Sequence, residues 1–286
     1  MAVRERDRLL CAGSMSLPAD DTCAMSPVEV RPIGRVHSPV TDTKLVSLSG
    51  GQAMVEVFPE FEAGLHRIGE YSHLWVMCWF HRANREKLRS APKRVNPYLP
   101  EYGVFALRGP GRPNPISLTL VQLASVEDRL LRVHGLDAVD GTPVLDIKPY
   151  NEHDSVASPR TPYFPASDNR LGRKWLRRQA LLHHREECEW LEVGLDFALR
   201  AEEVFGHLQA PDLRLTVEGP PCLLDVMQGI TRARFANPAR LEYDAGSARI
   251  RVVWRRGSER FETTLPPWAV PDGTVDEVDE WKWEPR

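Results

Sequence analysis

The sequence predicts two domains of different class, a mainly β domain followed by an α+β domain. Up to about residue 150, short apolar segments alternate with Gly- and Pro-containing turns and show little helical periodicity, which indicates a β-barrel or β-sandwich. From about residue 172, apolar residues first recur at helical spacing and then fall into strand-like segments. A chain of 286 residues is also long enough for two hydrophobic cores.

The N-terminal domain is expected to contain six strands and one short helix or turn. The segments whose apolar pattern predicts strands are residues 28–36, 52–58, 72–80, 116–126, 130–136 and 144–147. The short helix or turn is expected over residues 61–71. Residues 82–102 form a long, basic, Pro-containing loop, and a loop of this length in a compact domain is usually functional or disordered.

The C-terminal domain is expected to mix helices with a small sheet. A polar, Pro-rich linker over residues 156–172 separates the first domain, residues 28–155, from the second, residues 173–286. Apolar spacing predicts helix over 172–208 with an interruption at Gly194, and Pro220 and Pro221 suit the start of a helix over 223–230. The predicted strands are 213–217, 240–243, 248–254 and 260–265, the last three as an antiparallel meander.

Composition excludes several classes of protein. Hydrophobic residues make up 42% of the chain and charged residues 27%, and no apolar run reaches the length of a membrane span, so we expect no membrane partner. The five cysteines, at positions 11, 23, 78, 188 and 222, are odd in number and irregularly spaced, which favours a reducing cytoplasm over a disulfide framework. Residues 1–27 carry no periodicity and are expected to be a disordered or mis-annotated leader.

The charge distribution carries more information than the net charge of −3. Basic residues between positions 81 and 112 outnumber the acids, which are Glu86 and Glu101. The basic residues there are Arg82, Arg85, Lys87, Arg89, Lys93, Arg94, Arg108 and Arg112. A local basic field of this kind can recruit a phosphate backbone even on an acidic protein, and it is equally compatible with a solvated loop.

Two loops at predicted strand ends, called the two tips below, carry most of the functional information. In the first, a stiff Gly/Pro loop runs between Arg108 and Arg112, and two prolines restrict the backbone on either side of Asn114, so that these side chains are presented without a large ordering cost. The second tip is a turn at Asp140 and Gly141 that leads into a strand. The sequence contains no phosphate-binding Gly-rich turn between a strand and a helix, and no nucleophile elbow.

Four motifs carry a family resemblance, namely residues 33–39, 72–81, 103–118 and 140–150. Through them, residues 28–155 resemble the TsaA-like (TrmO-type) tRNA methyltransferase family. The resemblance implies a small, dimeric β-barrel that binds S-adenosylmethionine without a Rossmann fold. It further implies N6-methylation of threonylcarbamoyl-adenosine beside the tRNA anticodon. The implied cofactor residues are His81, Arg82, Arg108, Leu118, Asp140, Gly141, Thr142 and Pro143. Residues 47–49 depart from the family pattern, because an expected Arg is missing there.

Chemistry suggests roles but leaves alternatives open. A cationic sulfonium favours a nearby carboxylate, for which Asp140 and Asp146 are candidates, and the methionyl carboxylate favours the guanidinium of Arg108 or Arg112. A weakly acidic acceptor N–H can be polarised by His81, Lys148 or an Asp. We therefore take Asp146, Lys148 and Asn114 as catalytic candidates and add Arg112 to the cofactor residues. Alternatively, Asp140 and Gly141 form an ordinary turn, Asp146 and Lys148 merely pair across one strand face, and Trp75 and Trp79 belong to the core.

The C-terminal domain resembles the E-type component of the formylmethanofuran dehydrogenase family at His184, Cys188 and Gly194, and again from Cys222 to Thr231. The resemblance implies a metal-binding α+β domain. However, Glu186 replaces a His of the family pattern, and an expected Cys is missing after the second helix. We therefore expect a domain that has lost its metal, with His184, Cys188 and Cys222 as a partial zinc site in the alternative case.

The sequence as a whole predicts a cytoplasmic S-adenosylmethionine-dependent methyltransferase whose partners are tRNA and a second copy of the chain. One alternative is transfer from the same cofactor to a small-molecule acceptor. The other is a non-catalytic RNA- or metal-binding protein built on a barrel. The basic stretch from Arg170 to Arg185 either extends an RNA track or forms a solvated helix face.

Overall fold

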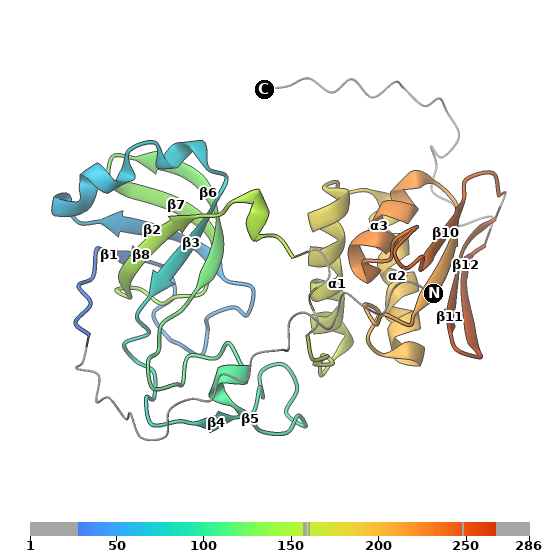
Figure 1. Cartoon of the computed structure of the whole chain (residues 1–286), viewed down its shortest axis with the longest axis horizontal. Helices are drawn as coiled ribbons and strands as arrows, with labels where there is room; N and C mark the ends of the chain where they lie inside the picture. The colour runs from blue at the N-terminus through green and yellow to red at the C-terminus, as the bar shows by residue number, and fades with distance from the viewer. Residues whose placement is uncertain (1–27, 157–158, 160, 248, 267–286) are drawn as a thin grey trace, which may run out of the picture.

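The computed structural model describes residues 28–156, 159, 161–247 and 249–266, so the predicted leader lies outside the described residues. The described chain forms two units, a strand-rich N-terminal unit and a C-terminal unit in which three helices lie between the barrel and a second sheet (Figure 1). The expected mainly β domain followed by an α+β domain is confirmed. None of the described helices is long and apolar enough to cross a membrane.

A closed six-stranded barrel forms the N-terminal unit, and its strands follow the order β1-β2-β7-β6-β3-β8 with antiparallel pairing throughout. The strands are β1 (Gly34–His37), β2 (Gly51–Val57), β3 (His73–Cys78), β6 (Thr119–Glu127), β7 (Leu130–Leu136) and β8 (Pro143–Pro149). Inward-facing side chains such as Val36, Val55, Leu74 and Leu131 are almost fully buried and fill the barrel. Each of the six predicted strands has a counterpart, although β1 begins six residues later than expected.

Short elements connect the barrel strands. The segment predicted as a short helix or turn is a pair of 3-10 helices, η1 (Pro59–Leu65) and η2 (Ile68–Glu70). The long basic loop contains the small ladder of β4 (Arg89–Ser90) and β5 (Tyr102–Gly103), and it is followed by η3 (Val104–Ala106). A last 3-10 turn, η4 (Glu152–Asp154), follows β8.

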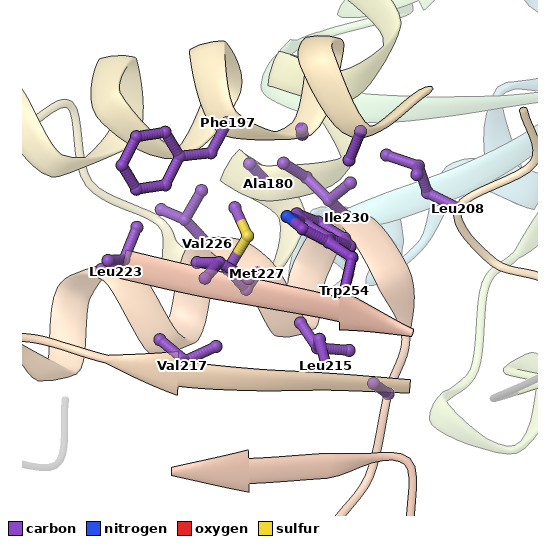
Figure 2. Close-up of a cluster of buried hydrophobic side chains, with 14 of the residues drawn as sticks. Ala180, Phe197, Leu208, Leu215, Val217, Leu223, Val226, Met227, Ile230 and Trp254 are labelled. Carbon is purple, nitrogen blue, oxygen red and sulfur yellow. The ribbon is translucent and has the colours of Figure 1, made fainter. Parts of the chain in front are cut away.

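In the C-terminal unit, α2 (Glu189–Phe205) and α3 (Pro221–Thr231) pack against a four-stranded sheet, and α1 (Asn169–His184) packs on these two helices. The sheet contains β9 (Arg214–Glu218), β10 (Leu241–Asp244), β11 (Ile250–Arg256) and β12 (Glu259–Leu265). Its core centres on the fully buried Trp254, with Met227, Ile230 and Leu215 around it (Figure 2). Helix α1 begins at Asn169, inside the segment predicted as linker.

Two predictions for this unit are wrong. Gly194 does not interrupt a helix; it lies in the middle of α2, where a Cβ would clash with the side chain of Val226 on α3. The break lies between α1 and α2 instead, where Arg185 adopts the left-handed conformation that ends a helix. The last three strands also do not form a meander, because β9 lies between β10 and β11 and pairs parallel with β10 through the α3 crossover.

The connecting segment is tied to both units. Ser167 donates its backbone N–H to Val95 at 3.0 Å, and the rings of Phe164 and Tyr102 meet edge to face at 5.3 Å. On the other side, the Tyr163 hydroxyl donates to Glu202 of α2 at 3.0 Å. The described part of the predicted linker is therefore a packed strap.

Candidate functional site

The end of strand β3 brings the two predicted tips together at one end of the barrel. The Trp79 N–H donates to the carbonyl of Pro143 at 2.9 Å, which anchors the Asp140 turn. The next residue, Phe80, donates its N–H to the carbonyl of Pro115 at 2.8 Å, which anchors the Gly/Pro loop. Two segments about thirty residues apart in the chain are thus joined through adjacent residues.

The second tip is a tightly bonded turn. The hydroxyl of Thr142, which is buried, donates to the carbonyl of Val139 at 2.7 Å, and Gly141 has a φ of 75°. The carboxylate of Asp140 accepts the backbone N–H of Ser38 at 3.0 Å and so fixes the chain just after β1. A Cβ at Gly141 would meet open space, so a ligand can approach the turn backbone there.

The two arginines of the first tip have different surroundings. The guanidinium of Arg112 turns back into its own loop, where it donates to the carbonyls of Val104, Leu107 and Gly109. Arg108 is exposed and donates a single bond, to the Leu118 carbonyl at 2.5 Å. A guanidinium carries five N–H donors, and within the described residues Arg108 uses one of them. Most of its donors therefore remain available to a ligand.

The same end of the barrel presents other exposed groups. His81, Arg82 and Asn114 are exposed, and Arg82 makes one bond, to the carbonyl of Thr41 at 2.7 Å. Apolar side chains lie exposed next to the first tip as well: Phe105 is 80% exposed, and Ile116 and Leu118 are about half exposed. Exposed guanidinium groups suit a ligand carboxylate, the carboxylate of Asp140 suits a cationic centre, and the apolar surface suits an aromatic base.

Asp146 and Lys148 lie further along β8 and outside the barrel. A bulge places Met77 opposite Asp146 but Cys78 opposite Val144, so Leu145 is the extra residue. With Val144 and Ile147 both packed on the core, Asp146 and Lys148 face outward. Their side chains pair at 2.7 Å, which is the arrangement expected of two residues that share a strand face. A catalytic role for Asp146, Lys148 or Asn114 stays a prediction.

Sequence reasoning did not single out two arginines that shape this end of the barrel. Arg85 lies over the ring of Trp79 at 5.3 Å and donates to the carbonyl of Pro113 at 2.9 Å, which ties the basic loop to the first tip. Arg94 donates to the carbonyl of Val46, next to residues 47–49, where the family pattern has an Arg that this chain lacks. Both belong to the basic stretch that the sequence revealed, but only the fold shows which carbonyls they reach.

A second cluster lies in the C-terminal unit, where His184, Cys188 and Cys222 come together with their donor atoms within 4.8 Å of one another. The Nε2 atom of His184 is 3.1 Å from the sulfur of Cys188. Burial and nearby acidic groups raise the pKa of the Cys222 thiol. Cys78 is different: it is fully buried in the barrel core, and burial raises the pKa of its thiol to about 12, as expected of an inert cysteine.

The basic face of α1 is partly neutralised. Arg173 and Arg177 pair with Glu192, and also with Asp196 and Glu187 respectively, so these two arginines belong to a solvated ion-pair network between α1 and α2. Lys174 and Arg178 make no ion pair within the described ranges. Together with Trp175 and Leu181 of α1 and Ser49 of the barrel, they line a cavity of about 310 Å³.

Comparison with known proteins bears on both units. The model of the tRNA-methyltransferase O N-terminal domain matches residues 41–155, which covers most of the barrel and both tips. A probable S-adenosyl-L-methionine-binding protein of Pyrococcus abyssi is 38% identical over 192 residues, which are 64% of this chain and 93% of the relative.

Two further relatives differ in how much they share. A probable S-adenosyl-L-methionine-binding protein of Archaeoglobus fulgidus is 34% identical over 242 residues, and the match covers 80% of this chain and 65% of the relative. The human tRNA (adenine(37)-N6)-methyltransferase is 41% identical over 102 residues, 35% of this chain and 23% of that protein. This chain therefore spans just under two thirds of the Archaeoglobus relative and less than a quarter of the human one.

Proposed function

The chain belongs to the tRNA-methyltransferase O family, and from this membership and the site geometry we propose that it is an S-adenosylmethionine-dependent methyltransferase that N6-methylates threonylcarbamoyl-adenosine next to the tRNA anticodon. The observation that carries the proposal is the meeting of the two tips at one end of the barrel, through the bonds of Trp79 to Pro143 and of Phe80 to Pro115. The named relatives support the cofactor and the acceptor.

The exposed groups at this end fit the cofactor. Arg108 and Arg82 offer guanidinium forks for the methionyl carboxylate, each already oriented by one bond to a backbone carbonyl. The exposed side chains of Phe105 and Leu118 supply apolar surface for an adenine ring. The open backbone at Gly141 lets the ligand approach the turn, and the Asp140 carboxylate adds negative charge there. When bound, S-adenosylmethionine supplies the electrophilic methyl group on a cationic sulfur.

The chain's own residues then bind the acceptor and accept the proton that its nitrogen releases on methylation. His81 and Asn114 are both exposed at this end of the barrel; we assign His81 to accept the proton that the acceptor nitrogen releases and Asn114 to hydrogen-bond the nucleobase substituent. A positioned donor and acceptor need little more than alignment for an in-line transfer, so a stiff loop held by Arg112 and two prolines suits the task. The basic residues Arg85, Arg89 and Lys93 around the loop give the phosphate backbone of an RNA a favourable field.

A two-part experiment tests the proposal. Purified protein is titrated with S-adenosylmethionine in a calorimeter, and it is then incubated with the labelled cofactor and tRNA that carries threonylcarbamoyl-adenosine. We expect cofactor binding, together with methylated threonylcarbamoyl-adenosine detected by nucleoside mass spectrometry. Folded protein that gives no heat with the cofactor contradicts the site, whereas binding without methylation of this tRNA contradicts only the acceptor.

A second acceptor class is favoured by one observation. Residues 47–49 lack the family's Arg, and a guanidinium reaches that loop from Arg94 instead, which donates to the Val46 carbonyl. A small-molecule acceptor in place of tRNA accommodates that difference. In that case, the labelled methyl group appears in metabolite extract and not in tRNA. Homodimer formation and a cytoplasmic location complete the proposal and are checked by light scattering and by fractionation.

A further inference from the structure

We propose that His184, Cys188 and Cys222 bind a zinc ion with a solvent molecule in the fourth position. The three residues come from the ends of three helices: His184 is the last residue of α1, Cys188 precedes the first residue of α2, and Cys222 is the second residue of α3. Their donor atoms all lie within 4.8 Å of one another. Two thiolates and one imidazole are a donor set that Zn²⁺ prefers, and the thiolates balance its charge.

The spacing needs little adjustment for an ion. Bonds of about 2.3 Å to sulfur and about 2.0 Å to nitrogen in a tetrahedron put donor atoms roughly 3.5 to 3.8 Å apart. The existing separations bracket that range, since His184 Nε2 and Cys188 Sγ are 3.1 Å apart and no pair of donors exceeds 4.8 Å. Small rotations of these helix-end side chains would close the site.

The position of Cys188 is an independent indication. N-cap positions favour Ser, Thr, Asp or Asn, whose side chains accept a backbone N–H of the first turn. Cys188 occupies the N-cap of α2 but makes no such bond, and its sulfur points to His184 instead. Cys188 and Cys222 thus stand at the N-termini of α2 and α3, which brings both sulfur atoms to the cluster.

The imidazole of His184 supplies a second indication. Its side chain is only 4% exposed, and its Nδ1 atom is buried without a hydrogen-bond partner in the described structure. Asp225, one helical turn after Cys222, has a carboxylate oxygen 3.7 Å from that atom. A His that binds zinc through Nε2 usually donates its Nδ1–H to a carboxylate, so binding of the ion explains both the buried nitrogen and the acid beside it.

The fourth position is assigned to solvent because, among the described residues, no fourth His, Cys, Asp or Glu joins the group. The side chain of Asp225 is 49% exposed, which shows that the cluster opens to water on that side. The expected loss of metal in this domain, drawn from the replacements at Glu186 and after α3, therefore does not follow from the geometry. Three ligands with one open position form a complete zinc site of the kind that keeps a bound water.

The test measures metal in the full-length protein. We expect about one zinc per chain by mass spectrometry after purification under reducing conditions, and less than about a fifth of that in Cys188→Ser, Cys222→Ser and His184→Gln. The matched control is His183→Gln, which changes the exposed neighbouring histidine, and Cys78→Ala controls for loss of a thiol. Circular dichroism of each variant separates loss of the ion from loss of the fold.

Cobalt substitution keeps the proposal testable if a variant unfolds. Chelated wild-type protein titrated with Co²⁺ should gain thiolate-to-cobalt charge-transfer absorption at one equivalent, and the spectrum should shift when azide is added to the open position. Asp225→Asn should keep the stoichiometry but weaken Co²⁺ binding about 10- to 100-fold. Folded wild-type protein that lacks both zinc and the charge-transfer band overturns the proposal. A Cys188–Cys222 disulfide that persists in protein purified under reducing conditions also overturns it. A spectrum insensitive to azide overturns the open position.

Discussion

The two arginines of the first tip should respond differently to the same substitution. In the wild-type protein, the guanidinium of Arg108 makes one bond to the protein, and its other donors are free for a ligand. Arg108→Ala removes this guanidinium. Hydrogen bonds between charged groups contribute about 1.5 to 3 kcal/mol, and Arg108 is exposed, so we take about 2 kcal/mol for the methionyl carboxylate. That loss corresponds to about a 30-fold weaker affinity for S-adenosylmethionine. The melting temperature should barely change.

Arg112→Ala removes bonds to three carbonyls of the loop itself. Carbonyls left unpaired in this partly buried loop cost about 1 to 3 kcal/mol each when water does not reach them. We expect faster hydrogen exchange over residues 104–118 and a weaker affinity that follows from the loss of loop order. Arg108→Ala should leave the exchange of this loop close to wild type.

Calorimetry and hydrogen exchange on the same preparations distinguish the two roles. Arg89→Ala is the matched control, because Arg89 is an exposed arginine of the same basic region whose nearest acid, Glu101, is 3.9 Å away. It should change neither measurement. Wild-type affinity in Arg108→Ala would refute the assignment of Arg108 to the cofactor, and unchanged exchange in Arg112→Ala would refute the role of Arg112 in ordering the loop.

Three further predictions concern stability. Gly194→Ala should lower the free energy of unfolding by about 1 kcal/mol, because overpacking against Val226 costs about 1 to 3 kcal/mol and helix propensity returns about 1. Gly172→Ala, whose Cβ meets only ordinary contacts, should not destabilise, and equal denaturant midpoints for the two variants would contradict this. Gly141→Ala, at a φ of 75°, should cost about 1 to 2 kcal/mol and weaken cofactor binding, whereas Gly103→Ala at a φ of −59° should be neutral in both melting and calorimetry. Burial raises the pKa of Glu202 above that of the unfolded chain, so its charged form disfavours the fold and stability rises as pH falls through the folded pKa. The gain in melting temperature from Glu202→Gln should therefore be larger at pH 8 than at pH 5, and a gain independent of pH would contradict it.

Local pattern was sufficient for most of the barrel. Residues 130–136 were predicted as a strand and are β7 without change, because clear turn residues bound an alternating apolar segment on both sides. The outward placement of Asp146 and Lys148 was less accessible, since it depends on the bulge at Leu145 that reverses the alternation partway along β8. A bulge is decided by how β8 pairs with β3, and that pairing joins residues about seventy positions apart.

The sequence was enough to predict which residues lie in the candidate site, but not which of them bind a ligand and which stabilise the loop. Arg108 and Arg112 flank one Gly/Pro loop and look equivalent in the sequence, yet one turns inward to three carbonyls and the other outward. Likewise, Arg85 and Arg94 were visible only as members of a basic stretch. The direction of a long flexible side chain depends on which carbonyls the fold leaves unpaired nearby, and those carbonyls belong to distant segments.

The helix break of the C-terminal unit and its proposed zinc site have one structural origin. A glycine in a helix costs about 1 kcal/mol in propensity, which favoured a break at Gly194, but close packing of α2 on Val226 requires a residue without a Cβ there. The chain turns instead at Arg185, which adopts a left-handed conformation, and the new helix starts at Cys188. That turn carries Cys188 back to within 3.1 Å of His184, four residues earlier. Had the break occurred at Gly194, a continuous helix would still have placed residues 184 and 188 on one face, but Cys188 would then lie inside a helix and not at the N-cap of α2, where its sulfur now meets His184 and Cys222.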